Sequence, residues 1–347
     1  MSRGIGELEP IQELVPEWLA VVVALLTQLG DIWFLAFVLA AFYWFDAPRR
    51  DNIATVAGAW LAGMGMYKGL KEIFGFPRPN EPLLDPELLP KLIQPLYEAT
   101  AMATGYGFPS GHAVNTTIVY FGLAYVLTVS TARRRFASAA AIVTTVCFTR
   151  LALGVHYLVD VVVGVAVGLA LLLAARALIN RRLSDPATIT FGLAVLFGVF
   201  FVVTSEIDAD AIFILGASLG AFAGWQLIML GRELVAVSRP SRALRPIAVR
   251  GGFASLALAS LLATYEYFPL LSAYTAGGTI GLTTAVIVTI PVMRHSEYAR
   301  RVGGAISFWI RMGLLGIRYL LTPSTWRRAY AGLRHHSQRL LEWIRTR

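Results

Sequence analysis

Long apolar runs alternate with short polar segments along almost the whole chain. A helix needs about 20 apolar residues to cross the hydrocarbon core of a bilayer, and about nine runs approach that length. We expect the crossings at residues 18–45, 52–74, 112–130, 136–154, 157–179, 188–205, 209–231, 250–267 and 271–293. The pattern therefore predicts an all-α, polytopic integral membrane protein.

The first of these runs is interrupted near its middle. Gly30 and Asp31 stand where an unbroken span would be apolar. The segment could be a shallow piece from 15 to 29 followed by a short crossing, or two crossings, or one kinked or re-entrant unit. We favour the single kinked or re-entrant unit.

The composition agrees with a membrane protein. Only 15% of the residues are charged, whereas soluble domains carry about 25%. The single cysteine, Cys147, excludes an intrachain disulfide, and no cysteine-based metal site is expected. The net charge of +9 is spread over short loops and the tail, so it is typical of membrane orientation and we expect no nucleic-acid partner.

The loops between the runs fall into a basic set and an acidic set. The basic set holds Arg49, Arg50, Arg133, Arg134, Arg135, Arg176, Arg181, Arg182, Arg232, Arg239, Arg242, Arg245 and Arg250. The acidic set holds Glu81, Asp85, Glu87, Glu98, Glu206, Asp208, Asp210 and Glu266. Because basic loops remain in the cytoplasm, we expect a multi-pass protein of the cell membrane with its N-terminus outside and its C-terminal tail inside.

Three short polar motifs interrupt this apolar background. They are Lys71-x6-Arg78-Pro79, Pro109-Ser110-Gly111-His112 and Arg150-x5-His156-x3-Asp160. Counting the spans places all of them at the outer ends of their helices. Residues far apart in sequence should therefore converge at one extracytoplasmic face.

The motifs hold groups that suit a phosphate. Lys71, Arg78 and Arg150 can neutralise its charge, and arginine can do so with paired hydrogen bonds. Ser110 and Gly111 stand where a helix begins, and free backbone N–H groups at such a position favour an anion. Ser110 could also serve only as a helix N-cap.

The remaining motif residues suit acid–base and nucleophilic chemistry. His156 and Asp160 are four residues apart and share a helix face, so Asp160 can fix the histidine tautomer and leave the other nitrogen as a nucleophile. His112 can then act as general acid and later as base. Singly, each could instead be a satisfied polar group between helices. Three fixed cations would repel a metal ion, so we expect no metal and no cofactor.

In this order and spacing, the motifs resemble those of the type 2 phosphatidic acid phosphatase (PAP2) superfamily, which includes glucose-6-phosphatases and vanadium haloperoxidases. The resemblance covers roughly residues 15–182. It implies a PAP2-like helical core and a metal-independent reaction through a phosphohistidine on His156, with His112 as acid and base. One position departs from the pattern, because the third motif usually begins Ser-Arg and here begins Thr149-Arg150.

The chain is expected to have a PAP2-like core over 1–182, a four-helix membrane region over 183–295 and a basic amphipathic cytoplasmic tail over 296–347. The nine-span layout is similar to that of glucose-6-phosphatases. The added helices could serve packing or a homodimer. In the tail we expect two interfacial helices on anionic lipid rather than a tenth crossing, because Arg311 and Arg318 would be costly within a bilayer.

These expectations favour a membrane phosphatase acting on a lipid phosphate or an isoprenyl (pyro)phosphate. The alternatives are a sugar phosphatase, a lipid phosphotransferase, and a non-enzymatic transporter or lipid-binding scaffold. The expected partners are a phosphorylated lipid or small molecule and membrane lipid. The leucine-rich segment 80–108 could pack its leucines inward as a covering loop or turn them toward lipid chains as an interfacial lid.

Overall fold

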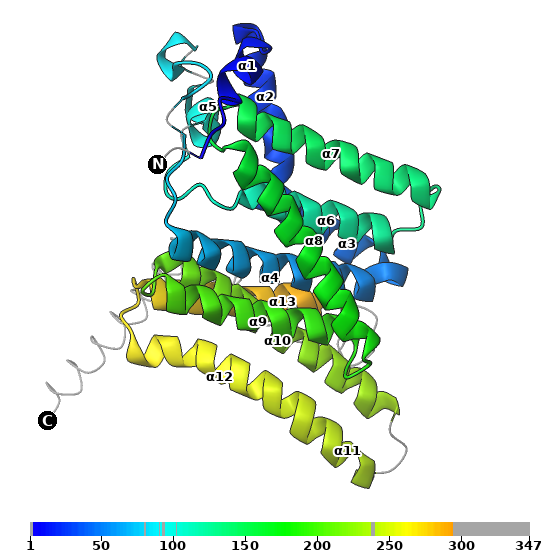
Figure 1. The fold of residues 1–347 in the computed structure, drawn as a ribbon. Coiled ribbons are helices and arrows are strands. Elements are labelled where there is room, and N and C mark those ends of the chain that lie inside the picture. The colour runs from blue at the N-terminus through cyan, green and yellow to red at the C-terminus, as the bar shows by residue number, and fades with distance from the viewer. Residues whose placement is uncertain are drawn as a thin grey trace, which may run out of the picture. The chain divides into compact units, whose positions relative to one another are not determined.

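The structure is a computed structural model that describes residues 3–79, 81–89, 91, 94–101, 103–236 and 240–293. All regular secondary structure in these segments is helical (Figure 1). Residues 1–289 form one compact unit. The tail 296–347 lies outside the described residues, so its expected interfacial helices stay a prediction.

The helices follow the apolar runs. The α-helices are α1 (Leu8–Glu13), α2 (Ala20–Thr27), α3 (Ile32–Phe45), α4 (Arg50–Phe74), α5 (Gln94–Ala101), α6 (Gly111–Val126), α7 (Ala132–Ala152), α8 (Leu158–Asn180), α9 (Pro186–Thr204), α10 (Ala209–Ala236), α11 (Pro240–Pro246), α12 (Gly252–Tyr267) and α13 (Ala273–Met293). Short 3-10 turns are η1 (Glu17–Leu19), η2 (Gln28–Gly30), η3 (Ala47–Arg49) and η4 (Pro86–Leu88), and η5 (Ile247–Gly251) is a π-helical turn.

Each expected crossing coincides with helix, and the all-α membrane fold is confirmed. Among the described residues, six helices are long and apolar enough to span a bilayer, and the pair Ala20–Gly30 and Ile32–Phe45, bent by 49°, would make a seventh. The other two expected crossings correspond to α4, which carries charged residues at both ends, and to α6, which has only 16 residues. The count of nine therefore stays a prediction.

Helix α4 lies between the two halves of this unit, with α6 to α8 on one side and α9, α10 and α12 on the other (Figure 1). Its glycines allow close contact with α9. A Cβ added at Gly58 would lie 2.4 Å from Thr190 Oγ1, and one at Gly65 would lie 2.5 Å from Phe197 O. Helices α4 and α9 therefore pack almost backbone to backbone. The two helices lie on either side of the domain boundary expected at residue 182, and that boundary stays a prediction.

Helices α6 and α8 also pack closely, at the ends that carry motif residues. A Cβ added at Gly164 would lie 2.7 Å from Ser110 O, and one at Gly168 would lie 2.9 Å from Thr117 Cβ. The two glycines Gly164 and Gly168, four residues apart, therefore allow close helix packing. The Ser110 N–H also donates to Asp160 O at 2.9 Å, so the starts of the two helices are held side by side.

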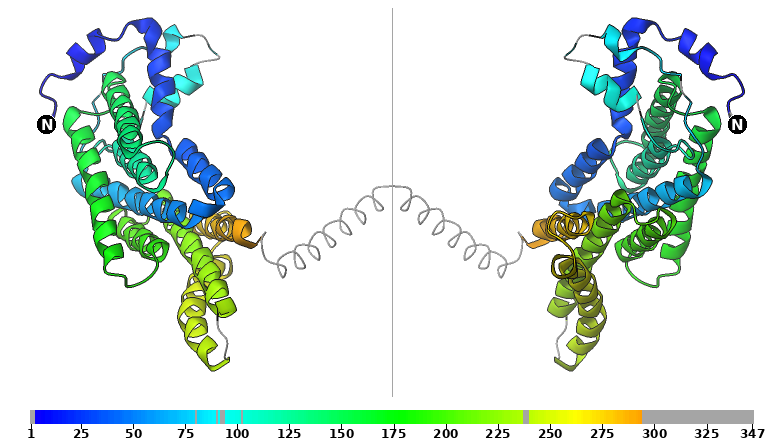
Figure 2. Two further views of the ribbon diagram at one scale, coloured as in Figure 1. Left: turned by 90° about the vertical axis from the view of Figure 1, so that its right-hand side faces the viewer. Right: turned by 90° about the vertical axis from the view of Figure 1, so that its left-hand side faces the viewer.

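The N-terminal helices α1 and α2, dark blue in Figure 2, lie against the C-terminal end of α7. Part of the segment 80–108 joins this contact: Leu84 is buried there, and Leu83 and Leu89 pack against it. Leu88 is 71% exposed. The described leucines thus mainly pack inward, as expected of a covering loop, while Leu92, Ile93 and the side chain of Leu96 lie outside the described residues.

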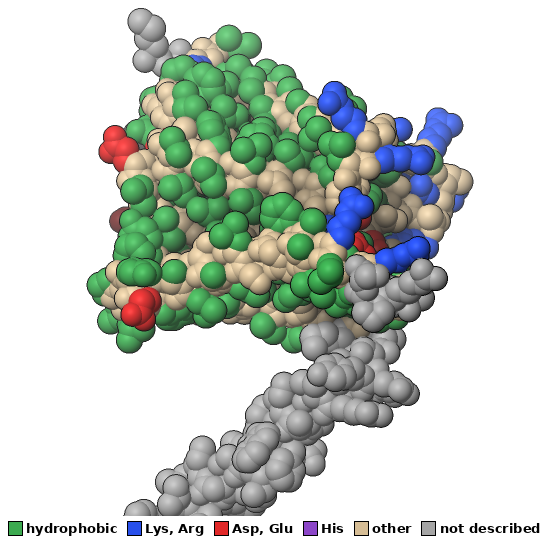
Figure 3. Space-filling model, turned by 90° about the horizontal axis from the view of Figure 1, so that it is seen from below, with side chains coloured by type: hydrophobic (Ala, Val, Ile, Leu, Met, Phe, Trp, Pro, Cys, Tyr) green, Lys and Arg blue, Asp and Glu red, His purple; other side chains and the backbone are tan. Residues whose placement is uncertain are grey.

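Most surface arginines gather on one side of the unit. On the face shown in Figure 3, lysines and arginines with an acidic group among them lie at one edge, and an apolar surface separates them from further acidic groups at the other edge. The helix ends agree with this view. Arg133 lies in the first turn of α7 and Arg176 lies in the C-terminal part of α8, whereas Arg150 and Asp160 lie at the opposite ends of the same two helices.

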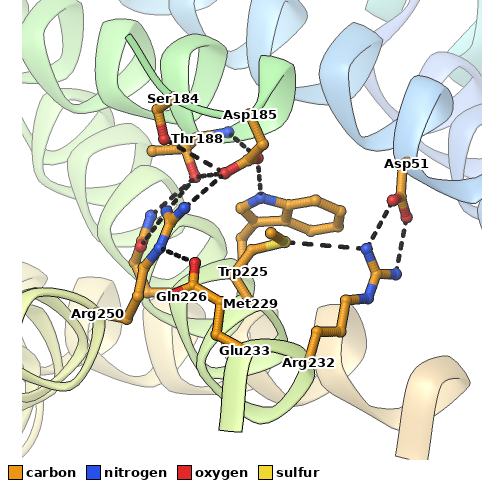
Figure 4. Close-up of polar contacts among 10 residues, drawn as sticks. All are labelled: Asp51, Ser184, Asp185, Thr188, Trp225, Gln226, Met229, Arg232, Glu233 and Arg250. Atoms are coloured by element: carbon orange, nitrogen blue, oxygen red, sulfur yellow. Dashed lines mark hydrogen bonds and ion pairs between the residues drawn. The ribbon is translucent and has the colours of Figure 1, made fainter. Parts of the chain in front are cut away.

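A polar network joins α9, α10 and α12 at the arginine-rich side (Figure 4). The Asp185 carboxylate caps α9 by accepting from Thr188 N at 2.9 Å, and it also accepts from Trp225 Nε1 at 2.7 Å. Arg250 donates to Asp185, at 3.1 Å, and to Gln226, at 2.9 Å. Every one of these partners comes from the region after residue 182, so the network fixes the added helices to one another.

Candidate active site

A cavity of about 500 Å³ opens where the motif-bearing ends of α4, α6 and α7 meet the turn before α8. Its walls include motif residues Lys71, Arg78, Gly111, His112, Arg150 and His156. The structure therefore brings residues of all three motifs into one site.

His156 is oriented by a guanidinium on one side and a carboxylate on the other. Its Nε2 lies 3.0 Å from Arg78 Nη1. Because a guanidinium only donates, Nε2 must accept, and the proton of the neutral ring resides on Nδ1. That Nδ1 lies 3.5 Å from Asp160 Oδ2. The basic lone pair of the neutral ring is thus on Nε2, where it accepts from Arg78.

The surroundings of His156 favour its neutral form. The residue is 1% exposed, and this burial places the pKa of the His156 imidazole well below its usual range. The positive charges of Arg78, Arg150 and Lys71 lower the same pKa further. At pH 7 the ring is therefore unprotonated, as a nucleophile requires.

The turn between α7 and α8 holds His156 in place. Gly154 has a φ of +67°, and a Cβ there would lie 1.8 Å from Glu81 O. Only glycine allows both the backbone conformation and the close approach of the loop. Arg78 Nη1 also donates to Val155 O at 3.0 Å, so Arg78 fixes the turn as well as the histidine.

Lys71 and Arg78 are positioned by backbone carbonyls. Lys71 Nζ donates to Tyr106 O at 2.8 Å, and Arg78 Nε donates to Thr104 O at 3.1 Å. Within the described part of the chain, neither side chain forms a salt bridge with a carboxylate. Their positive charge is therefore available to an anion.

Arg150 lies deeper in the wall and is 3% exposed. Its Nη1 donates to Thr27 Oγ1 at 3.1 Å, while its Nε has no hydrogen-bond partner among the described residues. A buried guanidinium with an unused donor needs an acceptor. A phosphate oxygen could provide that acceptor.

Ser110 and Gly111, both expected to bind phosphate at the start of α6, differ in their position relative to the cavity. Gly111 lines the cavity, and a Cβ there would lie 2.6 Å from the Tyr67 ring, so this position needs glycine for packing. Ser110 is fully buried and is not among the described residues that line the cavity. Its backbone N–H already bonds Asp160 O, so only its hydroxyl remains as a predicted phosphate ligand.

Two residues of the site were missed by the sequence analysis. Arg3 donates to Asp160 Oδ1 from Nη2 at 2.9 Å and from Nε at 3.2 Å, and it lies 4.8 Å above the Phe76 ring centroid. Asp31 Oδ1 lies 3.0 Å from His112 Nε2. Arg3 precedes the first helix and gave no signal, whereas Asp31 was a carboxylate inside an apolar run, which is a usual sign of function.

The added helices also reach the site. Lys68, which the sequence would allow to extend toward the membrane surface, instead pairs with Asp210. Its Nζ lies 5.7 Å from the Phe201 ring centroid. Phe201, Asp208 and Asp210 line the cavity, so residues beyond 182 form part of its wall.

Comparison with known proteins finds a family model over the motif-bearing helices. Residues 52–184 match the family model of the PAP2 superfamily. Over 154 residues the chain is 32% identical to lipid phosphate phosphatase delta of Arabidopsis thaliana, a match covering 42% of this chain and 35% of the relative. The chain thus matches about a third of that relative's length. No solved structure matches the chain.

The matched segment contains all three motifs and the helix ends that form the cavity. The likeness to the layout of glucose-6-phosphatases is untested and stays a prediction. The similarity of this membrane protein to the PAP2 superfamily therefore extends over residues 52–184.

Proposed function

We propose that the protein is a membrane phosphatase that hydrolyses a lipid phosphate or an isoprenyl (pyro)phosphate. One observation carries the proposal: His156 Nε2 lies 3.0 Å from Arg78 Nη1 in a cavity that Lys71 and Arg150 also line. A neutral nucleophile beside three cations suits attack on a phosphorus that carries negative charge. The match to a protein named as a lipid phosphate phosphatase supports the same activity.

In the first step, the lone pair of His156 Nε2 attacks phosphorus and the P–O ester bond breaks. Protonated His112 gives its proton to the leaving oxygen, and Asp160 stabilises the charged His156 ring through Nδ1–H. In the second step, His112 takes a proton from water, whose oxygen attacks the phosphohistidine. Inorganic phosphate leaves and His156 is restored.

Apolar side chains beside the phosphate-binding cations favour a lipid substrate. Ile73 is 56% exposed and Phe74 is 44% exposed, two and three residues after Lys71. Ile32 and Tyr106 are also exposed, and both line the cavity. Each CH₂ that a chain buries there would contribute about 0.8 kcal/mol, which a sugar phosphate cannot supply.

The proposed site faces the extracytoplasmic side and works without a metal ion. Its residues lie at helix ends opposite the arginine-rich ends, and arginine-rich ends face the cytoplasm. Lys71, Arg78 and Arg150 can neutralise the phosphate, which leaves no task for a divalent cation.

The test is phosphate release by the purified protein in mixed micelles with excess chelator. We expect a higher kcat/KM for long-chain phosphatidic acid than for glucose 6-phosphate, with full activity in chelator and inhibition by vanadate. Equal or better turnover of glucose 6-phosphate would favour a sugar phosphatase. Phosphate transfer to an added alcohol in place of water would favour a phosphotransferase. No turnover of any substrate would favour a transporter or scaffold.

A further inference from the structure

Asp31 occupies a helix N-cap position without acting as the cap. It follows η2 and precedes α3 with a ψ of 147°, which is the usual backbone conformation of an N-cap residue. An aspartate there normally accepts hydrogen bonds from N–H groups of the first turn. The Asp31 side chain makes no such bond, although the whole first turn is described. The carboxylate is therefore directed elsewhere.

The carboxylate contacts His112. Asp31 Oδ1 lies 3.0 Å from His112 Nε2, and the two side chains are 26% and 21% exposed. The neighbouring residue packs on the same ring, because a Cβ at Gly30 would lie 2.8 Å from His112 Cδ2. Both Asp31 and His112 line the cavity. The bend between α2 and α3 thus places residues 30 and 31 against one histidine.

The charge of Asp31 partly offsets the surroundings of His112. Burial above all, and then the positive charges of Arg150 and Lys71, disfavour the protonated His112 ring. Asp31 acts in the opposite direction and favours the protonated ring. A general acid must carry its proton when substrate binds, so a carboxylate at this position supports that role.

Asp31 is also independent of the family motifs. It precedes the matched segment 52–184, whereas Asp160 lies within the third motif. The site therefore contains two His–Asp contacts. Asp160, within the third motif, faces His156, and Asp31, outside the motifs, faces His112.

We propose that Asp31 is a positioning residue for His112, which holds the ring in place and stabilises its protonated form for proton transfer to the leaving group. The inference rests on the proposed phosphatase function and extends it to a residue outside the motifs. It makes a specific kinetic prediction. Proton donation matters for an alkyl alcohol, which is a poor leaving group, and matters little for p-nitrophenolate, which can leave without a proton.

The experiment compares Asp31→Asn with the wild type on two substrates in the same micelles, a long-chain alkyl phosphate and p-nitrophenyl phosphate. We expect kcat/KM to fall about 100-fold for the alkyl phosphate, the low end of general acid catalysis, and less than about tenfold for p-nitrophenyl phosphate. Asp31→Glu, which keeps the carboxylate, should restore part of the loss. The double variant, Asp31→Asn with His112→Ala, should have a kcat/KM for the alkyl phosphate only slightly lower than that of His112→Ala alone.

Asp46→Asn is the matched control. Asp46 lies at the other end of α3 and pairs with Arg49, so the same substitution should leave both substrates unaffected. If Asp31→Asn does not fold, Asp31→Glu serves as the test, with a smaller loss that is again selective for the alkyl phosphate.

Equal losses on the two substrates, or losses additive with His112→Ala, would overturn the role of Asp31. A wild-type protein that hydrolyses neither substrate would instead contradict the proposed function. The two failures are therefore distinguishable.

Discussion

His156 and His112 line the same cavity but meet different partners. Arg78 and Asp160 flank His156, and Asp31 contacts His112. A lone pair directed at a guanidinium suits a nucleophile, whereas a ring held by a carboxylate suits proton transfer. Replacing each of the two histidines should therefore impair a different step of the reaction.

Replacing His156 with alanine should abolish both phosphate release and formation of the phosphoenzyme. His112→Ala should slow turnover by roughly 10²–10⁴-fold while phosphoenzyme still forms from p-nitrophenyl phosphate. Both variants should keep the wild-type melting temperature. Rapid-quench trapping of labelled phosphoenzyme measures the difference. If His156→Ala turns over within about tenfold of wild type, a barrier change of about 1.4 kcal/mol, His156 is not the nucleophile.

The charge of Arg78 should contribute to the protonation state of His156. Burial is the largest cause of the lowered pKa of His156 and the Arg78 guanidinium is the next, so Arg78→Gln should raise that pKa part of the way toward its ordinary value. Since the nucleophile must be unprotonated, the fall of kcat/KM on the acid side should move to higher pH in this variant. NMR titration of labelled histidine in the substrate-free protein measures the pKa directly.

The control for this titration is Lys91→Gln, which removes a positive charge from the same connecting segment at an exposed residue outside the cavity. The pKa of His156 should not change in it. An unchanged pKa in Arg78→Gln would contradict the electrostatic role of Arg78.

At the scale of the helices, Arg250 connects three elements. It donates to Asp185 at the start of α9, to Gln226 in α10 and to Glu233 near the end of α10, from a π-helical turn that leads into α12 (Figure 4). Its side chain is 14% exposed and that of Asp185 is 19% exposed. Removing Arg250 would leave a largely buried carboxylate without its cation.

Arg250→Met should therefore destabilise the protein by about 2–4 kcal/mol, close to the cost of breaking a buried ion pair. Arg232→Met is the control. Arg232 pairs with Asp51, but the two side chains are 40% and 54% exposed, and such pairs contribute about 0–1 kcal/mol. Reversible unfolding in mixed micelles measures both values, and equal losses would show that the Arg250 network has no special structural role.

At the scale of the whole molecule, the separation of charge governs orientation. Basic side chains gather at one edge of the face in Figure 3, and the opposite edge shows acidic groups without them. The motif-bearing ends of α7 and α8 lie away from their arginine-bearing ends. If the basic loops remain in the cytoplasm, as is usual for membrane proteins, the cavity would open on the extracytoplasmic side.

Cysteine labelling on intact cells tests this orientation. In a Cys147→Ser background, a cysteine at Glu87, which is exposed in η4, should react with an impermeant thiol reagent. A cysteine at Arg134, exposed at the start of α7, should react only after the cells are permeabilised. The reverse pattern would place the active site in the cytoplasm.

Much of this protein follows from local properties of its sequence. Runs of apolar residues determine where helices form, because a bilayer leaves backbone groups no other partner over such a length. Spacing of four residues predicted a shared helix face for His156 and Asp160, but that prediction was wrong, because His156 lies in the turn before α8 and only Asp160 is helical. The apolar runs were sufficient to predict the helical membrane fold, and the motifs were sufficient to predict cavity residues that include Lys71, Arg78 and Arg150.

Only the tertiary structure decided which distant residues complete the site. Arg3 reaches Asp160 across 157 positions and Lys68 reaches Asp210 across 142, and no spacing rule connects such pairs. The break at Gly30 and Asp31 was visible in the sequence, but its contact with His112 depends on how α2, α3 and α6 pack. Likewise, the close packing of α8 on α6 buried Ser110 behind the cavity wall. Local patterns determine elements, whereas packing determines which side chains from different elements meet.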